Sequence, residues 1–134
     1  MGGDRQVKLL LDTHTWLWYL LGDERLPSAH RALITAAENQ LYLSPISVWE
    51  AHLLIERKRI AVEEAASQWI HKSMQVLPLR EAVLSFEVAQ KARNLSLAHQ
   101  DPADRFIAAT ASALKMPLLT SDARLRACPD IQCL

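Results

Sequence analysis

Short apolar runs alternate along this chain with longer segments in which apolar residues recur at helical spacing. The first run, Val7 to Leu11, is apolar apart from Lys8 and ends at Asp12. A run of this kind fits a strand that is buried on both faces of a parallel sheet. Similar runs predict further strands at residues 41–43, 76–79, 118–120 and 131–134.

The segments between these runs predict helices. Their expected ranges are 16–21, 27–39, 44–59, 62–74, 80–94, 102–115 and 121–127. Strands that alternate with helices indicate a helix-rich α/β sandwich around a mostly parallel sheet of about four to five short strands. The 134 residues suffice for a single domain over residues 1–134, and its polar first six residues are expected to be flexible.

The charge balance narrows the classes of function. Lys and Arg number 15, as do Asp and Glu, so the formal net charge is zero. This balance argues against a dominant non-specific nucleic-acid surface, which usually shows an excess of basic residues. It is compatible with a local basic rim, and it favours association of the chain with itself or with a partner.

The sequence shows neither a membrane span nor an export signal. No apolar stretch reaches the roughly 18 residues of a membrane span, and the first residues lack a signal-peptide pattern. Cys128 and Cys133 have no second pair that would suggest a zinc site. We expect both to be reduced thiols in a cytoplasmic protein.

Four carboxylates occupy similar positions near the ends of apolar runs or the starts of helices: Asp12, Glu50, Asp104 and Asp122. The carboxyl ends of parallel strands and the helix starts that follow them share one edge of a sheet, where ligands bind. Two such charges about 4 Å apart repel by roughly 4 kcal/mol at an effective dielectric constant of ~20. A divalent cation such as Mg²⁺ or Mn²⁺ would offset this repulsion and serve phosphate chemistry.

Each acid also has a local explanation as a helix cap. Asp12 and Asp122 could each cap the helix that follows a strand, and Asp101 three residues before Asp104 reads as a cap with Pro at the first helical position. The stretch 47–50 matches a capping box, which would explain Glu50. If Ser44 is the cap instead, Glu50 lies in the second turn and that explanation fails.

Taken together, four motifs resemble the PIN-domain ribonucleases, specifically the toxins of VapBC-type toxin–antitoxin pairs. They occur in the family's order, cover nearly the whole chain, and are Leu9-Leu10-Leu11-Asp12-Thr13-His14, Ser47-Val48-Trp49-Glu50, Asp101-Pro102-Ala103-Asp104-Arg105-Phe106-Ile107-Ala108-Ala109 and Leu119-Thr120-Ser121-Asp122. Each motif alone is weak, whereas the combination is specific. The sequence departs from the family at Ala103, where relatives often carry an aromatic residue.

The resemblance implies a PIN-like α/β/α sandwich and a metal-dependent endoribonuclease. By match to the family motifs, the acidic metal-binding quartet comprises Asp12, Glu50, Asp104 and Asp122, with Asp101 as an accessory acid and Mg²⁺ (or Mn²⁺) as the cofactor. Thr13 and Ser121 are candidates to orient the neighbouring carboxylates. The implied partners are an RNA substrate, a cognate antitoxin protein and a second copy of the chain, and no membrane.

Several basic and histidine side chains lie near these motifs. Arg105, Arg124 and Arg126 are candidate contacts for RNA phosphate, although pairing with an acid is the stronger expectation for Arg105. The cations at 57–59 end a helix and are interpreted as a solvated helix end. His14 and His99 flank acidic residues, and no role in the chemistry is assigned to either.

The four tryptophans fall into two pairs. Trp49 and Trp69 are expected to pack in the core. Trp16 and Trp18 are two residues apart on a short helix, so they point to different sides of it. We therefore expect the helix 16–21 to contribute to an interface with the antitoxin or with a second subunit.

Two alternatives to the nuclease remain open on the sequence. A metal-dependent phosphatase could use Asp12 as its nucleophile, but haloacid-dehalogenase-like enzymes place a second Asp two residues later, where this chain has His14. A receiver-like phosphoacceptor would want a lysine after a late strand, where this chain has Asp122. A non-catalytic α/β binding module would use the acids as caps alone.

Overall fold

The central sheet of the computed structural model has four strands, all parallel, among the described residues 7–98 and 100–134. The strands are β1 (Lys8–Leu11), β2 (Gln40–Leu43), β3 (Leu79–Glu81) and β4 (Leu118–Leu119), in the spatial order β3-β2-β1-β4. Leu11 is in register with Leu43 on one side and with Leu119 on the other. The carboxyl ends of β1, β2 and β4 therefore lie at the same edge of the sheet.

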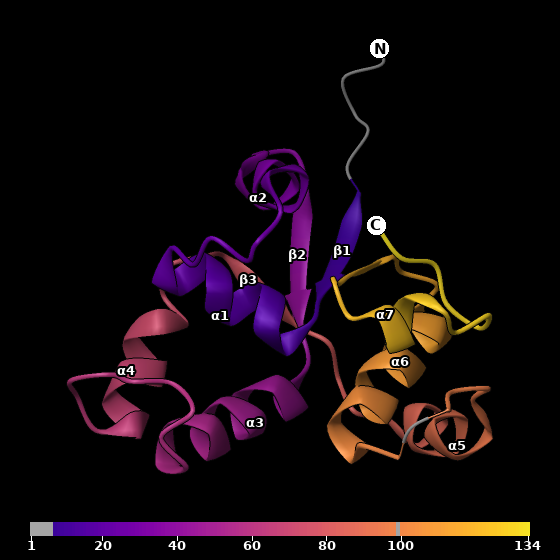
Figure 1. The fold of residues 1–134 in the computed structure, drawn as a ribbon. Helices are drawn as coiled ribbons and strands as arrows, with labels where there is room; N and C mark the ends of the chain where they lie inside the picture. The colour runs from indigo at the N-terminus through magenta and orange to yellow at the C-terminus, as the bar shows by residue number, and fades with distance from the viewer. Residues whose placement is uncertain (1–6, 99) are drawn as a thin grey trace.

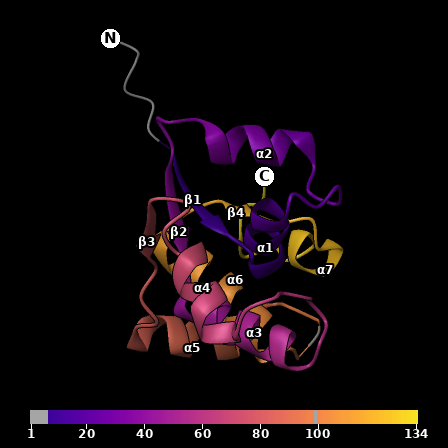
Figure 2. The same ribbon diagram turned by 90° about the vertical axis from the view of Figure 1, so that its left-hand side faces the viewer.

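Helices cover both faces of this sheet. They are α1 (Thr13–Leu21), α2 (Ser28–Thr35), α3 (Pro45–Glu56), α4 (Ala66–Ser73), α5 (Phe86–Asn94), α6 (Pro102–Leu114) and α7 (Ala123–Arg126). Figures 1 and 2 show α2 at one end of the molecule and α3, α5 and α6 together at the other. The predicted α/β sandwich is thus confirmed.

The alternation of side chains along β1 explains why both faces are apolar. Leu9 and Leu11 pack in one buried cluster with residues of α1, α2, α3 and α4, whereas Leu10 packs in another with residues of α6 and α7. Successive residues of a strand point to opposite faces, so an uninterrupted apolar run needs a helical layer on each side. Burial of this run on both faces therefore stabilises the three-layer arrangement.

Several helix and strand bounds differ from the prediction. The helix expected over 80–94 begins at Phe86, because Arg80 and Glu81 pair with Tyr42 and Leu43 as part of β3. The helices expected over 27–39 and 62–74 are shorter, and a strand at 131–134 is replaced by a single bridge between Leu118 and Cys133. Pairing with the neighbouring strand outweighs local propensity at the sheet edges.

Polar residues fix the starts of the helices that follow the strands. Ser44 caps α3 by accepting a hydrogen bond from the backbone N–H of Ile46, with Pro45 at the first helical position. Gly22 ends α1 with a φ of 62°, a left-handed conformation that costs glycine little. Among the residues that the structure describes, no helix is long and apolar enough to cross a membrane.

Residues 1–6, which the sequence predicts to be flexible, lie outside the described residues. The same holds for His99, whose role the sequence leaves open.

Candidate active site

Asp12 is the most enclosed of the five acids that the sequence predicts for the site, with 5% of its surface exposed. It follows β1 and caps α1, where its Oδ1 accepts a hydrogen bond of 2.8 Å from the backbone N–H of Thr13. Its Oδ2 accepts a second bond of 2.8 Å from the hydroxyl of Thr120, beyond the end of β4. Burial raises the pKa of Asp12 despite these bonds, and the charge of Asp122 raises it further. Asp12 is thus held rigidly in an environment that opposes its charge.

The start of α6 carries two more acids. Asp101 caps the helix and accepts hydrogen bonds from the backbone N–H groups of Ala103 (3.0 Å) and Asp104 (3.4 Å). Asp104 lies in the first turn, and its pKa is raised to about 8, first by burial and then by the charges of Asp12, Asp101, Glu50 and Asp122. All five acids therefore lie near one another at this edge of the sheet.

Glu50 lies in the second turn of α3, because Ser44 and not Ser47 is the cap. The capping-box explanation of Glu50 therefore does not hold. Its Oε1 is buried and has no hydrogen-bond partner among the described residues. Burial raises the pKa of Glu50 most, the Thr13 hydroxyl lowers it, and the charges of Asp101 and Asp12 raise it again.

Asp122, which lies between β4 and α7, is the fifth acid of the cluster. It caps α7, with its Oδ1 accepting hydrogen bonds from the backbone N–H groups of Arg124 (2.8 Å) and Leu125 (3.4 Å). The exposed guanidinium of Arg124 lies 3.7 Å from the same carboxylate. Three of the five acids, Asp12, Asp101 and Asp122, thus cap helices as well as belonging to the cluster, so the cap explanation and the site explanation hold together.

The chemistry of this cluster fits a hard divalent cation. Its potential donors are carboxylate oxygens, which such cations prefer, and the unpartnered Glu50 Oε1 is available to one. In the described part of the chain, however, no three His, Cys, Asp or Glu side chains are already grouped as a metal site. Donor type and charge therefore fit the cation, and side-chain rotation would have to complete its coordination.

Two hollows adjoin the cluster and share His14. One, of about 520 Å³, is lined by His14, Trp49, Glu50, Leu53, Leu54, Arg57, Arg59, Asp101, Pro102 and Ala103. The other, of about 250 Å³, is lined by Asp12, His14, Thr15, Trp18, Arg25, Ser121 and Asp122. The exposed His14 imidazole partly offsets the rise in the pKa of Asp12 and of Glu50 that burial causes. The site is thus open to a large ligand on both sides of His14.

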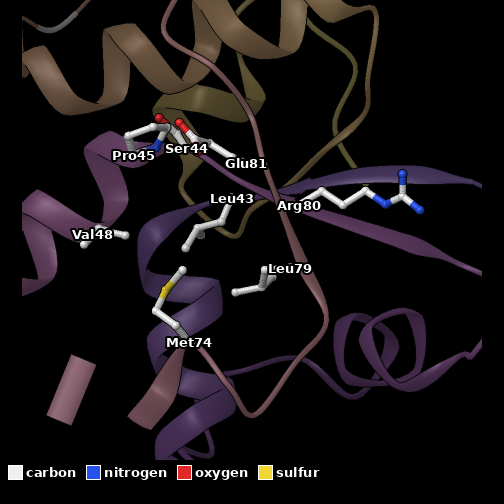
Figure 3. Close-up of a pocket in the computed structure, with 8 residues that line it drawn as sticks. All are labelled: Leu43, Ser44, Pro45, Val48, Met74, Leu79, Arg80 and Glu81. Carbon is white, nitrogen blue, oxygen red and sulfur yellow. The ribbon is translucent and has the colours of Figure 1, made fainter. Parts of the chain in front are cut away.

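A third cavity, of about 430 Å³, lies apart from the acids (Figure 3). Leu43, Met74 and Leu79 converge on it, whereas the side chain of Arg80 points away. Its lining is mostly apolar and includes none of the five clustered carboxylates. The clustered acids are thus associated with the two hollows beside His14 and not with this cavity.

Thr120 is the site residue that the sequence did not reveal. Its buried hydroxyl donates to Asp12 Oδ2 and accepts a hydrogen bond of 3.0 Å from the backbone N–H of Asp122. One hydroxyl therefore positions two acids of the cluster. Ser121, which was predicted for such a role, is exposed and lines the smaller hollow, so that prediction is corrected in favour of Thr120.

Replacement of Thr120 by valine is expected to lower the RNA cleavage that the resemblance implies by about 10- to 100-fold, the usual effect of losing a partner that orients a metal ligand. Thr120→Ser keeps the hydroxyl and should keep most of the activity. The measurement is the cleavage rate of both variants over a Mg²⁺ titration. Cleavage by Thr120→Val at the wild-type rate and Mg²⁺ requirement would show that Thr120 does not position the acids.

Arg105 does not face a substrate, contrary to its selection as a phosphate contact. Its side chain is buried, and Nε, Nη1 and Nη2 donate to the carbonyl oxygens of Ala92 (2.8 Å), Leu97 (3.1 Å) and Leu95 (3.4 Å). These carbonyls lie in the last part of α5 and just after it. Arg105 therefore ties α5 to α6, a structural role.

The remaining predicted side chains divide into buried and accessible ones. Trp16 is fully buried in the core, so its assignment to a partner interface is wrong, whereas Trp18 is half-buried. A hydrogen bond of 2.8 Å between the hydroxyls of Thr13 and Ser47 links α1 to α3. Arg126 is exposed, but its Nη1 donates to the carbonyl oxygens of Thr120 and Leu134. Arg124 and Arg126 therefore remain accessible cations near Asp122.

Comparison with known proteins finds similarity over most of the chain. The sequence model of the PIN-domain family matches residues 9–130 of this chain. The chain is 33% identical over 119 residues to Ribonuclease VapC22 of Mycobacterium tuberculosis (strain ATCC 25618 / H37Rv), covering 88% of this chain and 89% of that relative.

Solved structures with the same fold come from several bacteria. VapBC2 of Rickettsia felis, bound to a promoter DNA fragment, matches with a TM-score of 0.71 at 15% identity, over 96% of this chain and 98% of that one. FitAcB of Neisseria gonorrhoeae matches with a TM-score of 0.67 at 22% identity, over 94% and 96% of the two chains. At these identities the structures establish the fold.

Proposed function

The chain belongs to the PIN-domain family, and from this premise we propose that it is a metal-dependent endoribonuclease that acts as the toxin of a toxin–antitoxin pair. The 33% identical relative is named as a ribonuclease, which supports the activity. The observation that carries the proposal is the cluster itself. Four other acids lie close enough to Asp104 to raise its pKa, an arrangement that costs free energy unless a cation offsets it.

The proposed ligands of the ion, Mg²⁺ or Mn²⁺, are Asp12, Glu50, Asp104 and Asp122, with Asp101 as an accessory acid. When bound, the ion supplies charge neutralisation at the scissile phosphodiester and activation of a water nucleophile. The Thr13 N–H and the Thr120 hydroxyl hold Asp12 in one orientation, which keeps its oxygens in place during turnover. Arg124 and Arg126 are accessible cations that could bind flanking RNA phosphates.

The geometry disfavours a phosphatase that uses Asp12 as its nucleophile. Both carboxylate oxygens of Asp12 accept hydrogen bonds, and 5% of the residue is exposed. An attacking carboxylate oxygen would have to give up one of these hydrogen bonds, and His14 occupies the position where haloacid-dehalogenase-like enzymes place their second Asp. A non-catalytic binding module would not explain why Glu50 Oε1 has no hydrogen-bond partner among the described residues. It would also not explain why four other acids lie close enough to Asp104 to raise its pKa.

The test of the proposed function is divalent-dependent cleavage of RNA. Purified protein should cut single-stranded RNA in Mg²⁺ or Mn²⁺, stop in a chelator, and resume when the ion is restored. Cleavage that persists in the chelator would reject the metal-dependent mechanism. Cleavage that survives substitution of Asp12 would indicate a contaminating nuclease.

We further propose that the outer side of α1 binds a partner protein, an antitoxin or a second subunit. Solved neighbours are named VapBC, and one of them is described as a member of the VapBC family of toxin–antitoxin systems, which supports the proposal. On this helix Leu21 is exposed, and the half-buried Trp18 has its ring beside His14 (centroids 5.8 Å apart) and under Arg25 (5.1 Å). A partner seated there would also cover the hollow that Asp12 and Asp122 line.

Substitution Trp18→Glu should therefore abolish capture of the antitoxin or reduce the particle to a monomer, because it places a charge in the proposed interface. Size-exclusion chromatography with light scattering, with and without the co-expressed antitoxin, measures both effects. Trp18→Phe is the matched control and should behave as wild type. Unchanged size and unchanged antitoxin binding in Trp18→Glu would place the interface elsewhere.

A further inference from the structure

The larger hollow beside the acids has opposite charges at its two ends. Glu50 lies in the second turn of α3, and Asp101 raises its pKa, so these two acids lie together. Arg57 is the C-terminal cap of the same helix, seven residues after Glu50. At 1.5 Å per residue this is about 10 Å along the helix axis. Both the acids and Arg57 line the hollow. It therefore leads from the proposed catalytic acids to a basic end.

Trp49 lies in the wall of this hollow, although the sequence predicts a core position. The residue is 54% exposed, whereas its neighbour Val48 packs against the core. Trp49, Leu53 and Arg57 follow one another at intervals of four residues, so they lie along one side of α3. Single exposed apolar residues are common, but this indole borders a cavity of about 520 Å³ that Glu50 and Asp101 also line.

The basic end of the hollow presents two guanidinium groups. Lys58 adopts a φ of 57°, and the chain turns back so that the backbone N–H of Arg59 donates to the carbonyl oxygen of Leu54 (2.8 Å). This turn places Arg59 in the hollow together with Arg57. Within residues 7–98 and 100–134, neither guanidinium forms an ion pair. The pair is therefore available to an anionic ligand, which corrects its interpretation as a plain helix end.

We propose that this hollow binds one unpaired nucleotide of the RNA next to the phosphodiester that is cut, with its base stacked on Trp49 and its phosphate on Arg57 or Arg59. The inference rests on the proposed function, because a ribonuclease supplies the RNA. Aromatic faces bind bases of any sequence, and guanidinium groups bind phosphates, so the pair suits a single strand. Bases inside a duplex are already stacked on each other and cannot reach the indole. The hollow thus selects single-stranded segments over duplexes.

Binding to cleavage-deficient protein tests this proposal. Full-length Asp12→Asn protein, with and without Trp49→Ala, is titrated in Mg²⁺ against a fluorescently labelled, mixed-sequence 12-nucleotide RNA and against its duplex. Loss of one base stack should weaken binding of the single strand roughly 5- to 150-fold. Trp49→Phe should retain most of the affinity, and the preference for single strand over duplex should shrink in Trp49→Ala.

The matched control is Phe86→Ala, which removes an aromatic side chain that is 95% exposed and lies outside both hollows beside His14. It should bind as tightly as the parent protein. Three outcomes would overturn the proposal. The first is equal RNA affinity of Trp49→Ala and the parent protein, and the second is an equal loss of affinity in Trp49→Ala and Phe86→Ala. The third is the absence of RNA binding by the parent protein. A variant Trp49→Ala that loses the antitoxin but keeps RNA would also overturn it, since the hollow would then be a protein interface.

This readout separates the nucleotide site from the proposed function. Binding that depends on Trp49, in a protein that never cuts RNA in Mg²⁺ or Mn²⁺, would keep the site and reject the nuclease. Metal-dependent cleavage, together with RNA binding that Trp49→Ala does not change, would keep the nuclease and reject the nucleotide site.

Discussion

Substitution Asp12→Asn is expected to lower metal-dependent RNA cleavage by at least about 100-fold while leaving the fold intact. A metal ion supplies several kcal/mol of transition-state stabilisation, and each 1.4 kcal/mol changes the rate about tenfold, so loss of a ligand has a large effect. Asparagine keeps the shape of Asp12 and an oxygen that can accept the Thr13 N–H bond. The measurement is the single-turnover cleavage rate at saturating Mg²⁺, with thermal unfolding as the check on the fold.

The control for Asp12→Asn is Glu38→Gln, which removes one negative charge from an exposed turn before β2. This variant should cleave at the wild-type rate. Equal rates for wild type and Asp12→Asn in protein of the same purity would mean that Asp12 takes no part in the chemistry. A parallel loss in Glu38→Gln would instead indicate a general effect of net charge.

Substitution Asp104→Asn is expected to stabilise the metal-free protein at pH 8 and to reduce the dependence of its stability on pH. The folded-state pKa of Asp104 is about 8, against an ordinary value of 3.8, so the folded state binds the proton more tightly. A group of this kind stabilises the fold fully below about pH 4, and that contribution is lost as the pH rises to about 8. Burial also raises the pKa values of Asp12 and Glu50, which adds to the same trend.

Thermal unfolding in a chelator between pH 5 and pH 8 measures this effect. The melting temperature of the wild type should fall as the pH rises, and added Mg²⁺ should restore it by binding the native state. Asp23→Asn is a useful control because Arg25 lowers the pKa of that carboxyl to about 2, so its titration lies below this range. A wild-type melting temperature that is flat or rises over this range would contradict the predicted crowding of acids.

The sequence predicts the parts of the fold that depend on local apolar pattern. The strands β1 and β2 follow from short apolar runs, and α6 follows from its Asp-Pro start. It fails at β3, where Arg80 and Glu81 belong to a strand only because β2 lies beside them. Pairing of this kind depends on residues distant in the chain, so no local pattern reveals it.

The candidate site shows the same division. Asp12 and Asp122 could be selected because strand ends and the helix starts that follow them meet at a known edge of a parallel sheet, whereas Glu50, Asp101 and Asp104 rest mainly on the match to the family motifs. The choice between Thr120 and Ser121 could not be made, because it depends on which hydroxyl points inward after β4. The burial of Trp16 and the exposure of Trp49 likewise depend on which side of a helix faces the sheet, and both helices are apolar on more than one side.

The interior role of Arg105 has a similar cause. Beside an acid, an arginine is a natural candidate for phosphate binding, and the sequence gives no sign of the three carbonyl oxygens that surround it. Those oxygens belong to the end of α5 and the segment after it, which packing brings against α6. Long polar side chains are assigned reliably only when the tertiary contacts around them are known.

Calorimetric titration of Mn²⁺ into the metal-free protein tests the central claim, that the five acids form a divalent-metal site, most directly. The wild type should bind the ion saturably at pH 7, and binding should release protons, because Asp104 carries one at that pH. Asp12→Asn and Asp104→Asn should each bind at least about tenfold more weakly, whereas Glu38→Gln should match the wild type. Absence of binding by the wild type, or equal binding by all four proteins, would contradict the claim.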